Sequence, residues 1–147
     1  MRNRISAAAG FGLALVAALA FPVAVALASA AADEVSAASD ASKPFIVKIH
    51  ADWCGACTAL NGTFDELDAN LATRARIVVR DVTDRDSFAR SQEEAERLGL
   101  RRFFDAYKSR TGIVGVLHGA TREPVKILVG ETDPSEYEAA LALATAG

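Results

Sequence analysis

Hydrophobic residues recur along the chain with two different spacings, and each spacing predicts one type of secondary structure. Apolar side chains alternate at Phe45, Val47 and Ile49 within the segment 44–50, which predicts a half-buried strand. From Cys54 onward the steps change to three and four residues, the spacing of one face of an α-helix. The apolar positions of this predicted helix are Leu60, Phe64, Leu67 and Leu71.

The rest of the chain continues the alternation of strands and helices. Further strands are predicted at 77–82, 113–117 and 125–129, and the last two lie close enough to pair as a hairpin. We expect Gly62 to bend the first helix. The later helices have their own boundary signals: Asp84 or Asp86 as a cap, Gly99 as a stop, a short helix within 100–107, and Asp133-Pro134 at the start of the last one.

The resulting order is β-α-β-α-α-β-β-α. An early strand–helix–strand unit, followed by a hairpin and a closing helix, predicts an α/β fold with a mixed four-stranded sheet and helices on both faces.

The N-terminal thirty residues differ from the remainder. Arg2 and Arg4 precede the uncharged stretch Ile5–Leu27, and Ala28-Ser29-Ala30 offers the small residues that a signal peptidase recognises. We therefore expect a secretory signal at 1–30, a flexible lead-in at 31–43 and one folded domain at 44–147. An uncleaved membrane anchor stays open as an alternative, because the uncharged stretch is long enough to span a bilayer. Both interpretations place the folded domain outside the cytoplasm, in the periplasm or otherwise exported.

Charge and composition exclude some classes of partner. The formal net charge is −3 and Lys and Arg are not clustered, so no nucleic-acid partner is expected. The absence of a long exposed apolar stripe favours a monomer.

The chain has two cysteines, Cys54 and Cys57, at the predicted junction of strand and helix. A bridge between them closes almost no loop and so contributes little stability, whereas a 15-residue loop would contribute ~3 kcal/mol. Chemistry explains such a pair better. The N-terminus of a helix stabilises a thiolate at Cys54, which would attack a partner disulfide, and Cys57 would then resolve the mixed disulfide.

Two other interpretations of this pair remain open. A Cys-x-x-Cys pair can supply half of a zinc site or capture copper, but there is no second pair, and His50 and His118 are expected to be packed or surface residues. Alternatively, the domain is a binding module that carries the cysteines incidentally.

The segment Ala51-Asp52-Trp53-Cys54-Gly55-Ala56-Cys57, placed after an apolar strand and opening an amphipathic helix, resembles the active site of the thioredoxin superfamily. Together with Asp81-Val82-Thr83-Asp84, it is most similar to the C-terminal domain of DsbD-type periplasmic reductases. The resemblance implies a thioredoxin-like fold, a nucleophilic Cys54 and a resolving Cys57. It also implies that Trp53 offers partners a flat contact surface.

Three features depart from the superfamily's pattern. Lys48 stands where thioredoxins carry a buried acid; it would favour a thiolate or act as a base, or else extend to solvent and do neither. Thr111 takes the place of the expected cis-proline. Residues 100–109 resemble an insertion, which would either reshape the partner surface or add packing.

The dipeptide Gly55-Ala56 between the cysteines carries no charge. Strong oxidants of the superfamily usually have a histidine there, so we expect a potential nearer about −270 mV than about −120 mV and hence a reductase, with an oxidase or isomerase as the alternative. The expected partners are protein disulfides and dithiols, with a membrane thiol reductase as electron donor. No cofactor beyond the cysteine pair, and no metal, is expected.

Overall fold

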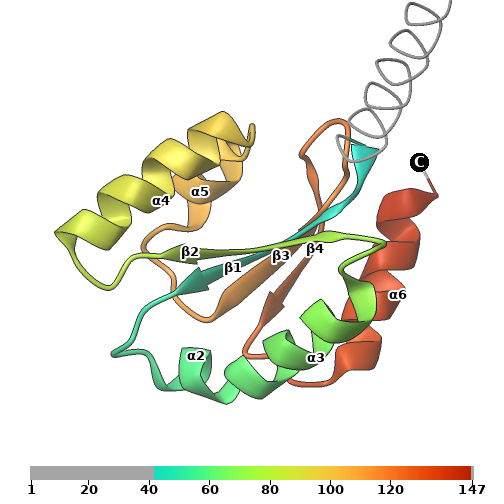
Figure 1. Cartoon of the computed structure of the whole chain (residues 1–147), viewed down its shortest axis with the longest axis horizontal. Coiled ribbons are helices and arrows are strands. Elements are labelled where there is room, and N and C mark those ends of the chain that lie inside the picture. The colour runs from blue at the N-terminus through green and yellow to red at the C-terminus, as the bar shows by residue number, and fades with distance from the viewer. Residues whose placement is uncertain (1–41, 147) are drawn as a thin grey trace, which may run out of the picture. The chain divides into compact units, whose positions relative to one another are not determined.

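The computed structural model describes residues 42–146, and these form a four-stranded sheet with helices on both faces (Figure 1). The strand order is β2-β1-β3-β4. The elements follow one another as β1 (Phe45–His50), α2 (Gly55–Ala59), α3 (Asn61–Leu71), β2 (Arg76–Asp81), α4 (Arg85–Arg97), α5 (Arg101–Tyr107), β3 (Ile113–Leu117), β4 (Pro124–Val129) and α6 (Pro134–Thr145).

Strand β1 lies inside the sheet and pairs on both sides. It runs parallel to β2 and antiparallel to β3, and β3 and β4 form the expected hairpin. The predicted mixed sheet is therefore confirmed. The predicted starts of β2 and β4 were each one residue late, because pairing extends to Arg76 and Pro124.

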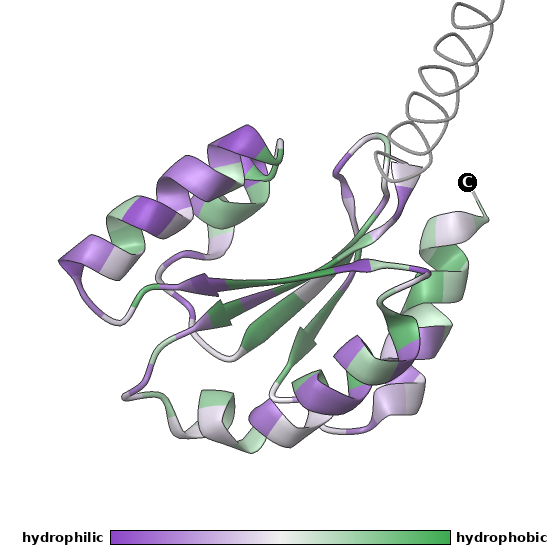
Figure 2. Cartoon of the chain, in the orientation of Figure 1, coloured by the Kyte–Doolittle hydropathy of each residue, from purple (hydrophilic) through white to green (hydrophobic). Residues whose placement is uncertain are grey.

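Two separate hydrophobic layers flank the sheet. Figure 1 shows α3 and α6 on one face and α4 and α5 on the other, and Figure 2 shows that the strands between them are largely apolar. The first layer is centred on Ile46, Phe64 and Tyr137. The second is centred on Phe45 and Phe104.

Local sequence signals place the ends of the helices. Asp84 accepts a hydrogen bond from the backbone N–H of Ser87, and the Ser87 side chain completes a capping box. The same helix stops before Gly99, whose φ of +72° is costly for other residues. Asp133 caps α6 with Pro134 in the first turn. Asp84, rather than Asp86, is thus the cap of α4.

The first predicted helix is divided, but not at Gly62. The interruption falls at Leu60, which ends α2 and precedes α3, while Gly62 lies inside α3. The bend is therefore two residues earlier than the glycine indicated. Leu60 is fully buried, so its packing in the core coincides with the break.

Helix α5 occupies most of the segment predicted to be an insertion. Phe103 and Phe104 are buried there. The ring of Phe103 lies so close to β3 that a side chain at Gly115 would approach Phe103 Cε2 to 2.3 Å. This segment therefore packs onto the sheet, which agrees with the expectation that residues 100–109 add packing.

The signal or anchor predicted at 1–30, and most of the lead-in, lie outside the described residues. Within 42–146, no helix combines the length and the apolar character needed to cross a membrane.

Candidate functional site: a dithiol at a helix N-terminus

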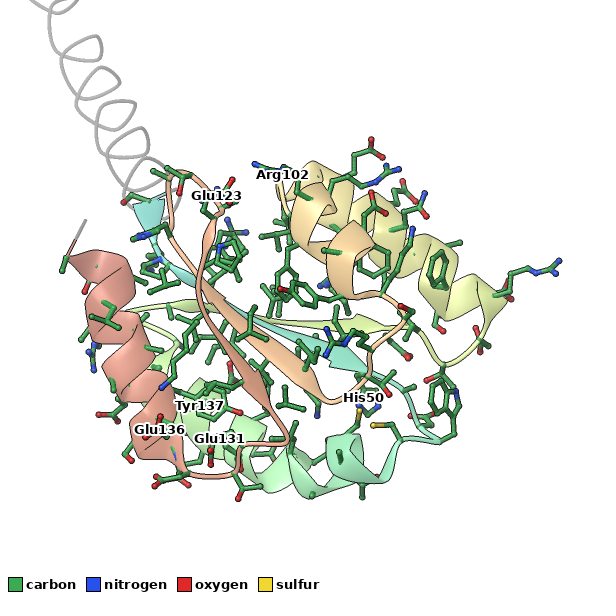
Figure 3. The ribbon with its side chains drawn as sticks, turned by 180° about the vertical axis from the view of Figure 1, so that it is seen from behind. His50, Arg102, Glu123, Glu131, Glu136 and Tyr137 are labelled. Carbon is green, nitrogen blue, oxygen red and sulfur yellow. The ribbon has the colours of Figure 1, made fainter. Side chains whose placement is uncertain are left out.

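The two cysteines lie where β1 ends and α2 begins. After His50, the chain turns through Ala51, and the backbone N–H of Cys54 donates to the carbonyl of Ala51 at 3.1 Å. Cys54 is the N-cap of α2, and Cys57 faces inward one turn later. Figure 3 shows His50 and the sulfur atoms at the same end of the sheet.

Cys54 is held as an acceptor at the helix N-terminus. Its Sγ accepts a hydrogen bond from the backbone N–H of Cys57 at 3.2 Å, and its side chain retains 9% of its exposure. Burial alone would raise the pKa of Cys54. Hydrogen bonds from the side chains of Cys57 and Thr111 and from the backbone of Cys57 and Ala56 outweigh it, so the pKa lies below its usual value. Cys54 is therefore the thiol prepared to ionise.

Cys57 has the opposite environment. It is fully buried, and its thiol donates to the carbonyl of Ile49 at 3.7 Å. Burial, reinforced by the hydrogen bond to Cys54, raises the pKa of Cys57, while the charge of Lys48 acts in the other direction. Both cysteines are reduced in this structure. The pair thus combines one thiol that ionises readily with one that stays protonated.

Lys48 lies in the interior beside this pair. Its side chain is 2% exposed, so the alternative in which it extends to solvent is wrong. The ammonium donates to the carbonyl of Cys57 at 3.0 Å and to Oδ1 of Asn61 at 2.9 Å. Burial lowers the pKa of Lys48, whereas Cys57, Cys54 and Asp65 oppose the shift.

Thr111 faces Cys54 from the segment before β3. Its hydroxyl is one of the donors that lower the pKa of Cys54. The following residue, Gly112, has φ of +77° and donates its N–H to the carbonyl of Ile49 at 2.9 Å. A side chain at Gly112 would meet Ala56 Cβ at 3.1 Å, so glycine keeps this approach open. Whether Thr111 replaces the cis-proline in binding partners stays a prediction.

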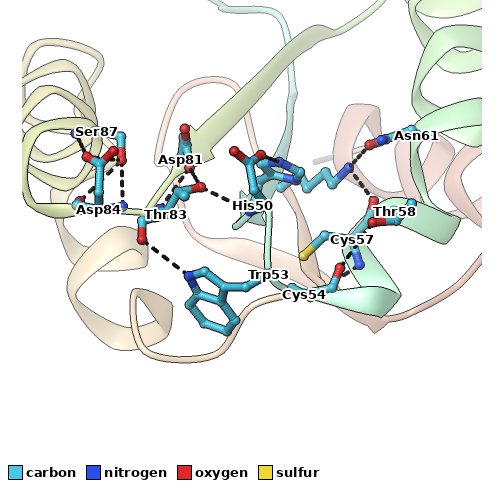
Figure 4. Close-up of polar contacts among 12 residues, drawn as sticks. His50, Trp53, Cys54, Cys57, Thr58, Asn61, Asp81, Thr83, Asp84 and Ser87 are labelled. Carbon is cyan, nitrogen blue, oxygen red and sulfur yellow. Dashed lines mark hydrogen bonds and ion pairs between the residues drawn. The ribbon is translucent and has the colours of Figure 1, made fainter.

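Trp53 is exposed and is held in place by a loop distant in sequence. Its side chain is 68% exposed, and its Nε1 donates to the carbonyl of Thr83 at 3.2 Å (Figure 4). The Thr83 hydroxyl accepts from the backbone N–H of Asp52 at 3.0 Å and donates to Asp81. The indole therefore presents a fixed apolar surface next to the dithiol.

The remaining predicted residues are arranged as follows. Gly55 and Ala56 are exposed in the first turn of α2, and open space surrounds the position of a side chain at Gly55. His50 Nε2 lies 3.1 Å from an oxygen of Asp52, and His118 Nδ1 lies 3.0 Å from the carbonyl of Ala144. In the described part of the chain, no three His, Cys, Asp or Glu residues gather as a metal site would require.

Two contributors to the site were missed by sequence reasoning. Asn61 binds Lys48, and its spacing of four residues from Cys57 within the single helix that the sequence predicts was the available signal. Thr83 fixes Trp53 and the loop from thirty residues away. Thr83 had been noted only as part of a resemblance, because a contact at that sequence distance leaves no local pattern.

The fold and the cysteine pair define a thioredoxin-like protein with a dithiol at the N-terminus of a helix. The sequence model of the thioredoxin family matches residues 25–96. Taken with the fold, this match shows that the chain belongs to the thioredoxin superfamily.

Solved structures of other proteins share this fold. The exposed lipoprotein thioredoxin of Streptococcus pneumoniae is 15% identical, with a TM-score of 0.52 over 72% of this chain and 88% of that one. A thiol:disulfide interchange protein of the thioredoxin family from Chlorobium tepidum is 18% identical, with a TM-score of 0.50 over 74% and 83%. At these identities the likeness shows the fold alone. None of the curated proteins compared with the chain matches it significantly.

Proposed function

We propose that this chain is an exported thiol–disulfide oxidoreductase that passes electrons from its Cys54–Cys57 dithiol to disulfides of other proteins. Membership of the thioredoxin superfamily implies thiol–disulfide redox chemistry in general terms. The observation that carries the specific proposal is the asymmetry of the pair. The Sγ of Cys54 caps a helix and accepts an N–H, while Cys57 lies fully buried beneath it.

The proposed reaction has two steps. The Cys54 thiolate attacks one sulfur of a partner disulfide, so that a mixed disulfide forms and the other partner sulfur leaves as a thiolate. Cys57 then loses its proton and attacks Cys54 Sγ. This step closes the Cys54–Cys57 disulfide and releases the second partner thiolate, so that two electrons have passed to the partner.

The supporting residues each have a proposed role in this reaction. Thr111 donates to the Cys54 thiolate, and Trp53 offers partners a rigid apolar contact. Gly55 and Ala56 leave the first turn uncharged, which supports a reducing potential near that of thioredoxin, ~−270 mV.

One observation favours the opposite direction of electron flow. The buried ammonium of Lys48 stabilises thiolates nearby and therefore the reduced form, which raises the potential. A disulfide oxidase or isomerase is accordingly the second candidate. We favour the reductase because the dipeptide Gly55-Ala56 between the cysteines carries no histidine and no charge, unlike that of the strong oxidants.

The proposed surroundings follow from the sequence. The signal at 1–30 would export the chain. The motifs of the folded domain at 51–57 and 81–84 resemble those of DsbD-type reductases. We therefore propose protein disulfides outside the cytoplasm as substrates and a membrane thiol reductase as electron donor, with the domain acting as a monomer.

Trapping the mixed disulfide tests the chemistry. Cys57→Ser, mixed with glutathione disulfide, should accumulate a glutathione adduct on Cys54 that mass spectrometry detects, because no thiol remains to resolve it. Cys54→Ser is the matched control and should form no stable adduct, since Cys57 is buried. Equal labelling of the two variants would contradict the assigned roles.

The export proposal has its own test. The full chain, expressed in a bacterium, should be recovered from the periplasm with Ala31 at its N-terminus. Recovery of an intact chain in the membrane fraction would indicate the uncleaved anchor instead.

A further inference from the structure

In the part of the chain that the structure describes, Lys48 is a buried cation that makes no ion pair with a carboxylate. It lies in the middle of the sheet, paired with Val79 of β2 and Val114 of β3. Both of its hydrogen-bond acceptors, the carbonyl of Cys57 and Oδ1 of Asn61, are neutral. The aromatic ring of Phe64 lies 4.9 Å from its Nζ.

This placement leaves the ammonium dependent on the redox site for an opposite charge. Among residues 42–146, Lys48 makes no ion pair within 4.0 Å with a carboxylate. A buried charge is costly unless it is paired. The groups whose negative charge acts on Lys48 are the sulfurs of Cys57 and Cys54 and, more weakly, the carboxylate of Asp65. The sulfurs can carry a negative charge only while the pair is reduced, so oxidation removes the main compensation for the charge of Lys48.

A cavity gives Lys48 a route for exchanging a proton with solvent. A space of about 240 Å³ is lined by Lys48, His50, Asn61, Phe64, Asp65 and Val79. Asn61 and Asp65 are exposed at its outer side, so the cavity leads from the buried amine to the surface. A polar cavity of this size holds water.

We propose that Lys48 is a switchable counter-cation for the dithiol. It carries a proton while the Cys54–Cys57 pair is reduced, and it releases that proton through this cavity when the disulfide forms. The inference rests on the proposed function, because it needs the cysteine pair to cycle between its two states. It makes Lys48 a positioning residue, which acts through the thiols rather than on the partner.

The reduced site holds Cys54 as a thiolate, Cys57 as a thiol and Lys48 as an ammonium. Oxidation forms the S–S bond, sends two electrons to the partner disulfide, and releases one proton from Cys57 and one from Lys48. Without Lys48, the same step would release only the proton of Cys57.

Other titratable groups near Lys48 do not replace it in this role. His50 and Asp65 line the same cavity, on β1 and α3. Tyr137 approaches from α6, where it packs edge-on against Phe64 and donates to the carbonyl of Glu131 (Figure 3). Burial raises the pKa of Tyr137 to about 12, so the phenol stays neutral. None of the hydrogen bonds of Lys48 goes to these groups.

The reduction potential as a function of pH tests the proposal. The wild type, Lys48→Met and Lys48→Arg are equilibrated with dithiothreitol or glutathione buffers from pH ~6 to ~10, a range that includes the ordinary titrations of Cys and most of that of Lys. Lys48→Met should shift the equilibrium about tenfold toward the disulfide at neutral pH, because one unit of thiolate pKa is a tenfold effect. When its disulfide is reduced, the Lys48→Met variant should also take up one proton fewer per two electrons than the wild type.

Lys48→Arg distinguishes the effect of the positive charge at position 48 from the effect of proton release there. Arginine remains charged throughout this range, so this variant should keep a potential near that of the wild type at neutral pH but show the shallower slope of Lys48→Met. Lys126→Met is the control, since Lys126 lies on the same face of the sheet but pairs with Glu136 at 2.6 Å. It should leave both the potential and the slope unchanged.

An independent readout keeps the proposal testable if the variants fold poorly. In the wild type carrying ¹³C-labelled lysine, the NMR titration of Lys48 Cε should have a lower midpoint in the oxidised protein than in the reduced one. Identical midpoints, or a Lys48→Met potential and slope equal to those of the wild type, would overturn the inference while leaving the proposed function intact. Failure of the wild type to form the bridge would instead overturn the proposed function as well.

Discussion

Alternate side chains of β1 face two different layers of the molecule. Phe45, Val47 and Ile49 are fully buried against α4 and α5, and every one of them is apolar. On the other face Ile46 begins an apolar layer under α3 and α6, but Lys48 and then His50 follow it toward the cysteines. One strand therefore supports a purely structural layer on one side and a layer that becomes polar toward the dithiol on the other.

This difference shows how the fold accommodates a costly site. The layer under α4 and α5 contains Phe103 and Phe104, whose burial stabilises the sheet without any contact with the sulfurs. The other layer holds the buried ammonium, which opposes folding. Substitutions on the first face should therefore change stability alone, and substitutions around the dithiol should change its chemistry.

The largest effect is expected at the nucleophile. Cys54→Ser should reduce the rate of insulin disulfide reduction by more than about a thousandfold, because removing a nucleophile leaves only background catalysis. Turbidity of the precipitating insulin chains measures this rate. The unfolding midpoint of Cys54→Ser in denaturant should stay close to that of the reduced wild type. A variant that retains a tenth of the activity would show that another group is the nucleophile.

The structural face should respond in the opposite way. Phe104→Ala should lower the free energy of unfolding by about 3–5 kcal/mol, because the fully buried ring leaves a cavity. The reduction potential of the folded variant should match that of the wild type. Denaturant unfolding and glutathione equilibration measure the two quantities, and a shifted potential would show that the two faces are coupled.

Replacing the buried cation should stabilise the folded protein. In the oxidised state, Lys48→Met should raise the free energy of unfolding at neutral pH by about 1–3 kcal/mol, since the variant avoids the cost of burying the Lys48 ammonium or of removing its proton on folding. The pKa of Lys48 is lowered in the folded state, so the wild type carries its full penalty below that folded pKa. The penalty shrinks as the pH rises toward ~10.4, the pKa of an unfolded lysine.

Denaturant unfolding of both proteins at several pH values checks this prediction. The gap between wild type and Lys48→Met should close as the medium becomes alkaline. A gap that stays constant, or a less stable variant at neutral pH, would show that the hydrogen bonds of Lys48 outweigh the burial of its charge.

The smallest effect is expected from the donor opposite Cys54. Thr111→Val keeps the shape of the side chain but removes a hydroxyl that lowers the pKa of Cys54. Alkylation of Cys54 by iodoacetamide should then require a higher pH and be about fivefold slower near pH ~7, since a typical hydrogen bond contributes about 1 kcal/mol. Thr58→Val is the control, because that hydroxyl contacts the carbonyl of Cys54. Equal pH profiles for Thr111→Val and the wild type would remove Thr111 from the site.

Much of the fold could be predicted because its signals are local. The alternation in 44–50, the cap at Asp84 and the stop at Gly99 depend on neighbouring residues, and each appears where expected. The division of the first helix at Leu60 could not be located, because it coincides with tertiary packing rather than with the glycine nearby.

The site was predictable in part for the same reason. The motif around Cys54 and Cys57 is continuous in sequence, so its position at a helix N-terminus followed from the pattern. The burial of Lys48 depends on how α2 and α3 pack over β1, and the link from Trp53 to Thr83 joins two separate loops. Neither contact leaves a trace in the local spacing of residues.

The reduction potential of the Cys54–Cys57 pair tests the central claim most directly. Equilibration of the domain in dithiothreitol and glutathione buffers should give a value well below about −220 mV, which would allow the dithiol to donate electrons to other disulfides. A value between about −180 and −120 mV would contradict the reductase assignment and make the protein a disulfide donor or isomerase. No measurable bridge at all would contradict the redox function itself.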